Sequence, residues 1–285
     1  MFDYLKVKKE MEEPDSPELA EHLSEIAAHF AELEEPKRAE KVYARVYSIY
    51  SALYSKDNEK YIIPFAMCCN SYGDVLSDLE KYDAALEHYN IALELFTEIA
   101  EKGNSSLLDG ISTEYNNIGD IYFFKGEYDI AEDNYRKALD ILEELSKNGD
   151  KAYMEDVAYC YDSIAKAKSG NEKYSEALEC YDKVISIYED ITKGFKINEH
   201  TMAFFEDLAT ALADKGYTAS CDKDFETTEK YYKRSAEIYE KLAAAFPANY
   251  SEELASQYDD LSAMYDDMGN KEMAKEYHRM ARNIK

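Results

Sequence analysis

Asparagine and aspartate side chains recur at a fixed interval along this chain. Asn70 and Asn116 are 46 residues apart, and Asp74 and Asp120, four residues further on, repeat the same interval. An Asn amide both donates and accepts hydrogen bonds, so it can hold the backbone of an extended peptide whatever the peptide's sequence. Each such bond contributes about 0.5–1.5 kcal/mol net. The chemistry indicated is therefore recognition, although the same residues would also suit the exposed face of a helix.

The residue types that catalyse reactions or bind metals form no recognisable arrangement. The five histidines make neither an HExxH motif nor a Cys/His metal spacing, and His22 and His29, seven residues apart, are more typical of a helix surface than of a metal pair. The acidic cluster from Asp259 to Asp267 lacks the Gly-bent loop of an EF-hand. A glycine-rich phosphate loop is also missing. We therefore expect a protein that is not an enzyme and that uses no cofactor and no metal.

The chain has a formal net charge of -27, from 60 acidic and 33 basic side chains. So acidic a surface repels phosphates, which argues against nucleic acid and against an anionic membrane as partners. It permits a basic partner, but the same charge also serves solubility.

The five cysteines form no CxxC pair, and they indicate buried thiols in a reducing compartment. The N-terminal residues contain no apolar run of signal-peptide length, and no segment approaches the ~20 apolar residues of a membrane span. We expect a cytoplasmic protein.

The interval of 46 residues extends over most of the chain and is marked by small residues, each followed four residues later by a ring. The small residues are Ala39, Ala85, Ala131, Ala177, Thr228 and Ala274, and only the step to Thr228 is longer, at 51 residues. The rings are Tyr43, Tyr89, Tyr135, Tyr181, Tyr232 and His278. Self-similarity at a fixed period predicts an array of repeated units.

The third unit shows what each repeat contains. Its apolar residues Tyr115, Ile118 and Tyr122 share one face of a helix. A second apolar stripe runs from residue 128 to residue 145, and the Lys-Gly-Glu sequence at 125–127 indicates a turn between the two. Each unit is therefore predicted to be two antiparallel helices, A and B. The small residue is expected where they cross, because helices about 8–10 Å apart need a small side chain at their contact.

This pattern resembles the tetratricopeptide repeat, which reads W-x2-L-G-x2-Y, then A-x3-F, then P. In the third unit the first six of these places are taken by Tyr115, Ile118, Gly119, Tyr122, Ala131 and Tyr135. The period is 46 instead of the usual 34, so the resemblance is to a long-repeat subclass, similar to the repeats of kinesin light chains. It implies an all-α fold, an α-solenoid of about six antiparallel helix pairs forming a right-handed superhelix.

The resemblance covers residues 17–285. The expected units span about 17–62, 63–108, 109–154, 155–199, 200–249 and 250–285. Residues 1–16 lie outside the period and are expected to be a tail or a short capping helix. The fifth unit looks irregular: helix A is assigned to Phe205, Leu208, Ala209 and Leu212, and about seven extra residues then precede Thr228.

In the family that this chain resembles, helix A lines a concave face. Adding the period along helix A gives the candidate groove residues Asn70, Asp74, Asn116, Asn117, Asp120, Phe123, Tyr159, Asp162, Lys166 and Glu206. Acidic side chains prevail on this face, and Lys166 is the main basic exception. The basic side chains with which related repeats clamp chaperone C-terminal carboxylates are therefore lacking. The resemblance therefore implies a basic or neutral segment of another protein, or a peptide, bound in an acidic concave groove.

Two functions follow from the resemblance. One is a scaffold or adaptor for protein–protein interaction. The alternative is a peptide-sensing regulator that changes superhelix curvature on binding a short signalling peptide, because small changes in each repeat add along a stack. Bacterial regulators of this kind often carry a helix-turn-helix domain, for which residues 1–16 are too few.

Replacing Ala131 with Leu is expected to overpack the crossing of helices A and B in the third unit. The free energy of unfolding should fall by about 1–3 kcal/mol, as measured by chemical denaturation. An unchanged midpoint would contradict the placement of Ala131 at a helix crossing.

Overall fold

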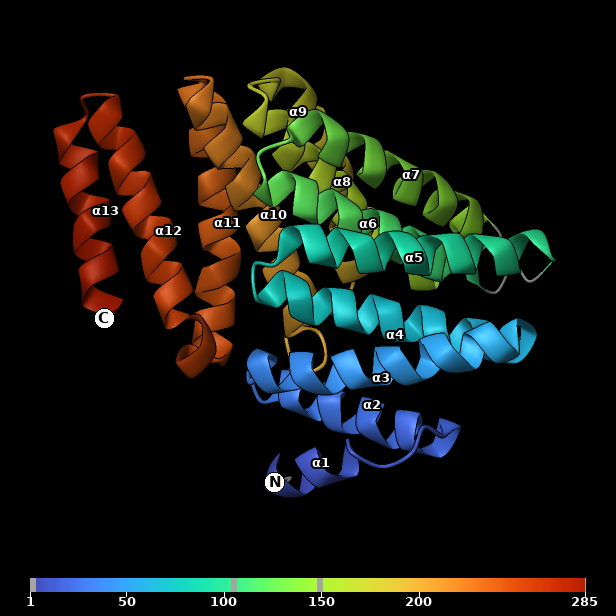
Figure 1. Cartoon of the computed structure of the whole chain (residues 1–285). Helices are drawn as coiled ribbons and strands as arrows, with labels where there is room; N and C mark the ends of the chain where they lie inside the picture. The colour runs from blue at the N-terminus through green and yellow to red at the C-terminus, as the bar shows by residue number, and fades with distance from the viewer. Residues whose placement is uncertain (1–3, 104–106, 148–150, 285) are drawn as a thin grey trace. The chain divides into compact units, whose positions relative to one another are not determined.

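The computed structural model describes residues 4–103, 107–147 and 151–284. In these ranges the chain is built from α-helices and short turns and contains no strand (Figure 1). The all-α fold of paired helices expected from the repeat is confirmed. The chain divides into two compact bodies, an N-terminal body of Met1–Leu142 and a C-terminal body of Glu143–Lys285. Each body is described by itself.

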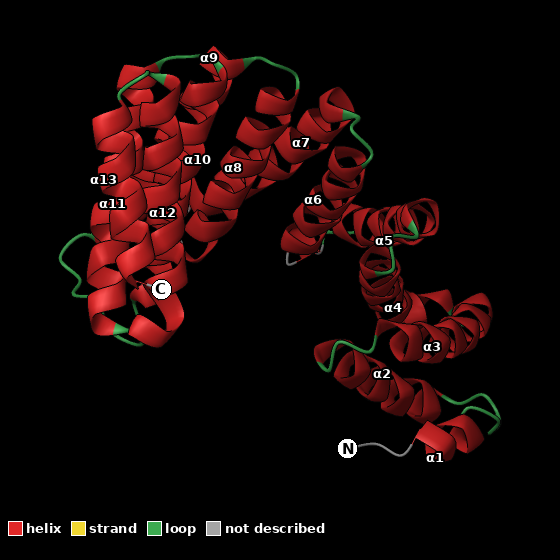
Figure 2. Ribbon diagram, turned by 90° about the vertical axis from the view of Figure 1, so that its left-hand side faces the viewer, coloured by secondary structure: helices red, strands yellow, loops and turns green. Residues whose placement is uncertain are grey.

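The N-terminal body contains three helix pairs and a short leading helix. Its helices are α1 (Tyr4–Glu10), α2 (Pro17–Glu32), α3 (Pro36–Lys56), α4 (Asn58–Asp78), α5 (Tyr82–Glu101), α6 (Leu108–Phe124) and the greater part of α7 (Tyr128–Lys147). From α2 to α6 each helix packs against the next one along the chain (Figure 2). The A helices α2, α4 and α6 also contact one another in turn.

The C-terminal body repeats this arrangement. Its helices are α8 (Met154–Gly170), α9 (Tyr174–Thr192), α10 (Met202–Cys221), α11 (Phe225–Ala245), α12 (Pro247–Asp267) and α13 (Lys271–Ile284), preceded by a 3₁₀ turn at Lys151–Tyr153. Each of these helices packs against its successor.

Residues 4–10, within the segment expected to be a tail or a capping helix, form α1. Val7 of this helix is buried, and the ring of Tyr4 packs edge-on against Phe30 of α2 at 5.7 Å between centroids. Arg45 of α3 holds the segment that follows, because its guanidinium donates to the carbonyl oxygens of Met11 and Glu13. The first helix pair is thereby covered on one side.

The same turn closes every A–B pair. One residue in each turn has a positive φ, and these residues recur in phase: Glu34, Glu80, Gly126, Glu172, Lys223 and Gly269. In the third unit the next amide, that of Glu127, donates to the carbonyl of Tyr122 at 2.8 Å, and the other five turns have the equivalent bond. This is the Schellman arrangement that satisfies the last carbonyls of a helix. It is kept even where the left-handed residue is Glu or Lys, which adopt this conformation at a cost.

A glycine of helix A packs against the ring of helix B in three of the units. A Cβ atom placed on Gly73, Gly119 or Gly216 would lie 2.6 Å from the ring of Tyr89, Tyr135 or Tyr232 respectively. Such a distance is far inside van der Waals contact, so only glycine lets the two helices approach this closely.

The third of these contacts corrects the phase expected for the fifth unit. Leu212, Gly216, Thr228 and Tyr232 have the same spacing as Tyr115, Gly119, Ala131 and Tyr135. The fifth unit is therefore regular, and its helix A had been placed seven residues too early. Residues seven apart lie on the same face of a helix, and α10 is 20 residues long, so the apolar pattern allowed both placements.

Cysteine burial is only partly as expected. Cys68, Cys69 and Cys160 are buried, whereas Cys221 is exposed where α10 ends. The prediction that all five thiols are buried is wrong. None of the helices in the described part of the chain combines the length and the hydropathy needed to cross a bilayer.

Two glycines of α6 provide a matched test of the helix contact. Gly119→Ala should lower the free energy of unfolding by about 1–3 kcal/mol, because its methyl group meets the Tyr135 ring. Gly110→Ala adds the same methyl group at 3.7 Å from Phe96, an ordinary contact. It should stabilise the protein by up to about 1 kcal/mol, because Ala favours helix over Gly. Equal effects of the two changes in urea denaturation would contradict the close approach at Gly119.

Candidate peptide-binding grooves

Three of the expected groove residues line one pocket in the C-terminal body. Tyr159, Asp162 and Lys166 come from α8, and the facing wall comes from α10. Helix α9 forms the floor through Val184 and Tyr188. The pocket has a volume of 280 Å³. Its two walls are successive A helices, as the repeat implies for a concave face.

Lys166 joins the two walls of this pocket. Its Nζ lies 2.7 Å from Asp162 Oδ2 on its own helix and 3.2 Å from Asp214 Oδ2 on α10. Burial by itself lowers the pKa of Lys166, but the two carboxylates outweigh that effect and raise the pKa above its ordinary value. Lys166 therefore stays charged and compensates part of the negative charge around it.

The remaining carboxylates of the pocket are crowded. Burial raises the pKa of Asp207, and the neighbouring charges of Glu206 and Glu155 raise it further, against a hydrogen bond from Tyr188. Burial also raises the pKa of Asp162, although Lys166 is beside it. Raised pKa values of this kind mean that the ionised carboxyl groups lack full compensation. Lys166 therefore neutralises the carboxylates of this pocket only in part.

The N-terminal body has a pocket in the corresponding place, between α2 and α4 with α3 as its floor. It has a volume of 660 Å³ and none of the ten candidate residues lines it. Aromatic and apolar side chains form much of its lining, and two carboxylates join them. The aromatic and apolar residues are Tyr43, Tyr50, Tyr61 and Met67, and the carboxylates are Glu21 and Glu25. Met67 is 59% exposed. The in-phase residues Ser24 and Ala28, which also line this pocket, were the signal that could have located it.

Two candidate carboxylates in the N-terminal body serve the core. The hydroxyl of Tyr89 donates to Asp74 Oδ1 at 3.0 Å, and that of Tyr135 donates to Asp120 Oδ1 at 2.7 Å. Asn117 Nδ2 lies 3.5 Å from the same oxygen of Asp74. Burial, with a contribution from the charge of a neighbouring aspartate, raises the pKa of Asp74 to about 6. These carboxylates satisfy the polar ends of buried rings, and neither of them lines the pocket between α2 and α4 or the pocket between α8 and α10.

Asn70 lies beside a buried acid that the sequence had not singled out. Glu114 of α6 is only 1% exposed, and neither of its carboxyl oxygens has a hydrogen-bond partner of ordinary geometry in the described structure. Burial raises the pKa of Glu114 to about 8, the charge of Asp74 adds to the shift, and the nearby Asn70 amide opposes it. Asn70 is half-buried, as is Asn116 on the next A helix.

The last two candidates are engaged within their own bodies. Phe123 is half-buried and packs against the ring of Tyr128 at 5.4 Å between centroids. Glu206 accepts a hydrogen bond from the Tyr250 hydroxyl at 2.8 Å. With the corrected phase, the fifth unit presents Asp214 in the place of Asn117, which is how Asp214 comes to meet Lys166. Asp214 and Tyr188 are the groove residues that the sequence reasoning missed.

Two buried lysines add charge to the core of the C-terminal body. Lys168 donates to Glu176 of α9, and Lys215 donates to Asp182 of the same helix. Lys215 also lies over the ring of Tyr231, 4.5 Å from its centroid. Among the described residues no three His, Cys, Asp or Glu side chains are grouped so that they could hold a metal ion.

Glu114→Gln is expected to change the pH dependence of stability. The pKa of Glu114 is raised by folding from 4.5 to about 8. The folded state therefore binds the carboxyl proton of Glu114 more tightly than the unfolded state does. The free energy of unfolding of the parent falls as the pH rises from 4.5 to about 8. The variant should gain stability over the parent by up to about 1.4 kcal/mol per pH unit across the window, measured by urea unfolding at several pH values. Glu127→Gln, an exposed change, is the control, and a pH-independent gain for Glu114→Gln would contradict the buried carboxyl.

Comparison with known proteins agrees with this geometry. Residues 66–144 and 111–190 match the family model described as tetratricopeptide repeat. A comparison with curated protein sequences gave no match.

Solved structures of repeat proteins are similar over most of the chain. BtubC (BKLC) from P. vanneervenii has a TM-score of 0.67 at 16% identity, covering 87% of this chain and 90% of that one. A putative kinesin light chain from Podosopora anserina has a TM-score of 0.61 at 12% identity, covering 82% and 100%. The STAND protein PH0952 from Pyrococcus horikoshii has a TM-score of 0.67 at 20% identity, covering 98% of this chain and 39% of that one. At these identities the likeness concerns the fold. Residues 66–190 therefore match the tetratricopeptide repeat, and the solved structures show that the chain has the fold of such repeat proteins.

Proposed function

We propose that this chain is an interaction scaffold that binds a basic segment of another protein in its A-helix grooves. The tetratricopeptide-repeat fold is that of a protein–protein interaction scaffold. The observation that carries the charge preference is the pocket between α8 and α10. Asp162 and Asp207 there have raised pKa values although Lys166 is present.

A cation from the partner would stabilise this pocket in two ways. An Arg or Lys side chain beside Asp207 would compensate a charge that burial and neighbouring carboxylates now disfavour. Tyr159, which is 43% exposed, presents its ring at the same pocket and can contact a cation through its face. At 280 Å³ the pocket is the size of one or two side chains, so it fits a residue of a protein segment.

The pocket between α2 and α4 suits a different side chain. Its tyrosines and Met67 form an apolar surface, and Glu21, Glu25 and Lys60 also line the pocket. An aromatic or aliphatic residue of a partner would bury apolar area there, at about 25 cal/mol per Å². The A-helix pockets of the two bodies thus differ in chemistry.

The peptide-sensing alternative rests on the contacts of Lys166. This residue joins α8 to α10 through Asp162 and Asp214. A ligand cation that competes for these carboxylates would weaken a link between two A helices and alter their spacing. PH0952 is described as having a tetratricopeptide repeat sensor, and its structure covers nearly all of this chain.

Asp207→Asn should weaken the binding of an Arg-Ala decapeptide by about tenfold, because one carboxylate of the pocket is lost. Fluorescence anisotropy would measure the affinity, and Glu179→Gln, an exposed change of equal charge on α9, is the control.

Binding to the parent should also weaken as the pH falls, because Asp162 and Asp207 take up protons at higher pH than ordinary carboxyl groups. Equal affinity of the parent for an Arg-Ala and a Glu-Ala peptide would refute the charge preference. A change in small-angle scattering on binding would favour the sensor over a static scaffold.

A further inference from the structure

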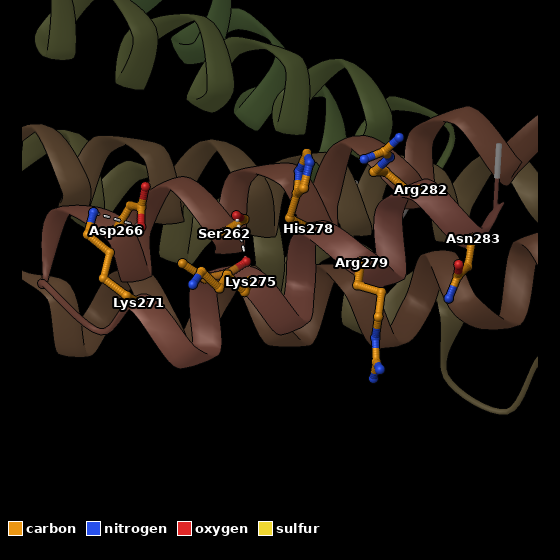
Figure 3. Close-up of a pocket in the computed structure, with 9 residues that line it drawn as sticks. Ser262, Asp266, Lys271, Lys275, His278, Arg279, Arg282 and Asn283 are labelled. Carbon is orange, nitrogen blue, oxygen red and sulfur yellow. Dashed lines mark hydrogen bonds and ion pairs between the residues drawn. The ribbon is translucent and has the colours of Figure 1, made fainter.

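The outer side of the last helix pair holds a groove of opposite charge to the rest of the chain. It lies between α12 and α13 and has a volume of 830 Å³ (Figure 3). Its lining includes five basic side chains, all from α13: Lys271, Lys275, His278, Arg279 and Arg282. We refer to it as the C-terminal groove.

The C-terminal groove has the position of a helix-binding surface. In the preceding pair, Tyr232 of α11 belongs to a core cluster with Leu261 and Met264 of the next A helix, α12. His278 of α13 occupies the place of Tyr232 in the repeat, and the small Ala274 occupies the place of Thr228. Within each body, a pair that is followed by another A helix packs against it: α3 contacts α4, α5 contacts α6, α9 contacts α10 and α11 contacts α12. Helix α13 presents the corresponding surface in the C-terminal groove.

The lining of the C-terminal groove has a cation at one place where earlier pairs are apolar. Arg282 stands in the place of Leu93, Leu139 and Ile185, whereas the place of Lys275 is Leu in two earlier pairs and Glu in three. Lys271 contacts Asp266 at 3.0 Å, and His278 lies 3.4 Å from Asp259. Within the described part of the chain, Lys275, Arg279 and Arg282 make no ion pair. Their spacing of four and three residues puts them on one side of α13.

Ordinary capping explains only part of this charge. A terminal repeat needs a polar outer face, but solubility does not require a positive one, and this chain uses acid elsewhere. The helix dipole favours Arg282 in the last turn of α13. It disfavours a cation in the first turn of the helix, where Lys271 lies.

We infer that the C-terminal groove binds an α-helix of another protein that presents an acidic stripe. A helix fits because, within each body, the earlier pairs that are followed by an A helix receive it on the corresponding surface. An acidic stripe fits because Lys275, Arg279 and Arg282 are three cations that have no ion pair in the described structure. Glutamates with the same spacing on a partner helix would form charge-assisted contacts with them. A second copy of this chain fits poorly when it uses the same groove, since each cation would then face another cation.

The test uses the full chain and a synthetic acetylated peptide of the same 14-residue length as α13. The peptide consists of Ala and Leu with Glu in the matching stripe, and a second peptide has Gln in place of each Glu. The parent protein should bind the Glu peptide about tenfold or more tightly than the Gln peptide, with an affinity that falls as salt is raised. A third peptide with the same charges and a central Pro, which breaks the helix, should bind weakly.

A triple variant that combines Lys275→Glu, Arg279→Glu and Arg282→Glu should lose binding of the Glu peptide. The matched control is Lys37→Glu with Lys41→Glu and Lys56→Glu, which makes the same charge change on exposed positions of α3. It should bind as the parent does. Circular dichroism and the thermal midpoint verify that both variants fold. If the groove variant does not, the single change Arg279→Glu replaces it.

Three outcomes would overturn the inference. The first is equal affinity for the Glu and Gln peptides. The second is undiminished binding by the groove variant. The third is self-association, seen by analytical ultracentrifugation, that the groove variant abolishes, because the occupant would then be a second copy. Asp207→Asn should leave this binding unchanged, so that the inference and the proposed function can fail separately.

Discussion

The contact between a small residue on helix A and a ring on helix B is the constraint on which the rest of this structure depends. At Gly73, Gly119 and Gly216 the ring lies so close that a Cβ atom would be 2.6 Å from it. The approach brings the two helices of a pair together along their length. The Schellman turn at the end of helix A sets the direction of the return, through the same backbone bond in all six pairs.

The same rings connect the core to the groove. Tyr135 excludes a side chain at Gly119 with its face and donates its hydroxyl to Asp120, one residue further along helix A. Tyr89 does the same with Gly73 and Asp74. A buried hydroxyl needs a partner, and the carboxylate of helix A supplies it. The acidic character of helix A is therefore partly a requirement of packing.

Charge is distributed unevenly over the molecule in a way that net charge hides. The pocket between α8 and α10 has too little positive charge, and carboxyl pKa values there are raised. The C-terminal groove has three cations without an ion pair in the described structure. Both features stand out because ion pairs, such as Lys166 with Asp162 and Asp214, occur close by.

The sequence by itself determined the fold. Small residues and rings recur at the same spacing in all six units, and they mark where two helices cross. This pattern can be found in a sequence because side-chain volume follows directly from residue type. The same periodicity located Tyr159, Asp162 and Lys166 on one wall of a pocket. It failed in the fifth unit, because residues seven apart share a helix face and the apolar stripe of α10 continues over both placements.

Only the tertiary structure decided which polar residues are available for binding. Asp74 and Asp120 look alike to any reading of the sequence as groove residues, but each accepts a hydrogen bond from a tyrosine fifteen residues away. Glu114 reads as one more acidic residue on a helix, yet it is buried without a hydrogen-bond partner of ordinary geometry in the described structure. Burial and partnership depend on which helices meet, and the facing helix comes from elsewhere in the chain. Residue type reports a side chain's chemistry, whereas its free energy depends on neighbours that only the packed structure brings together.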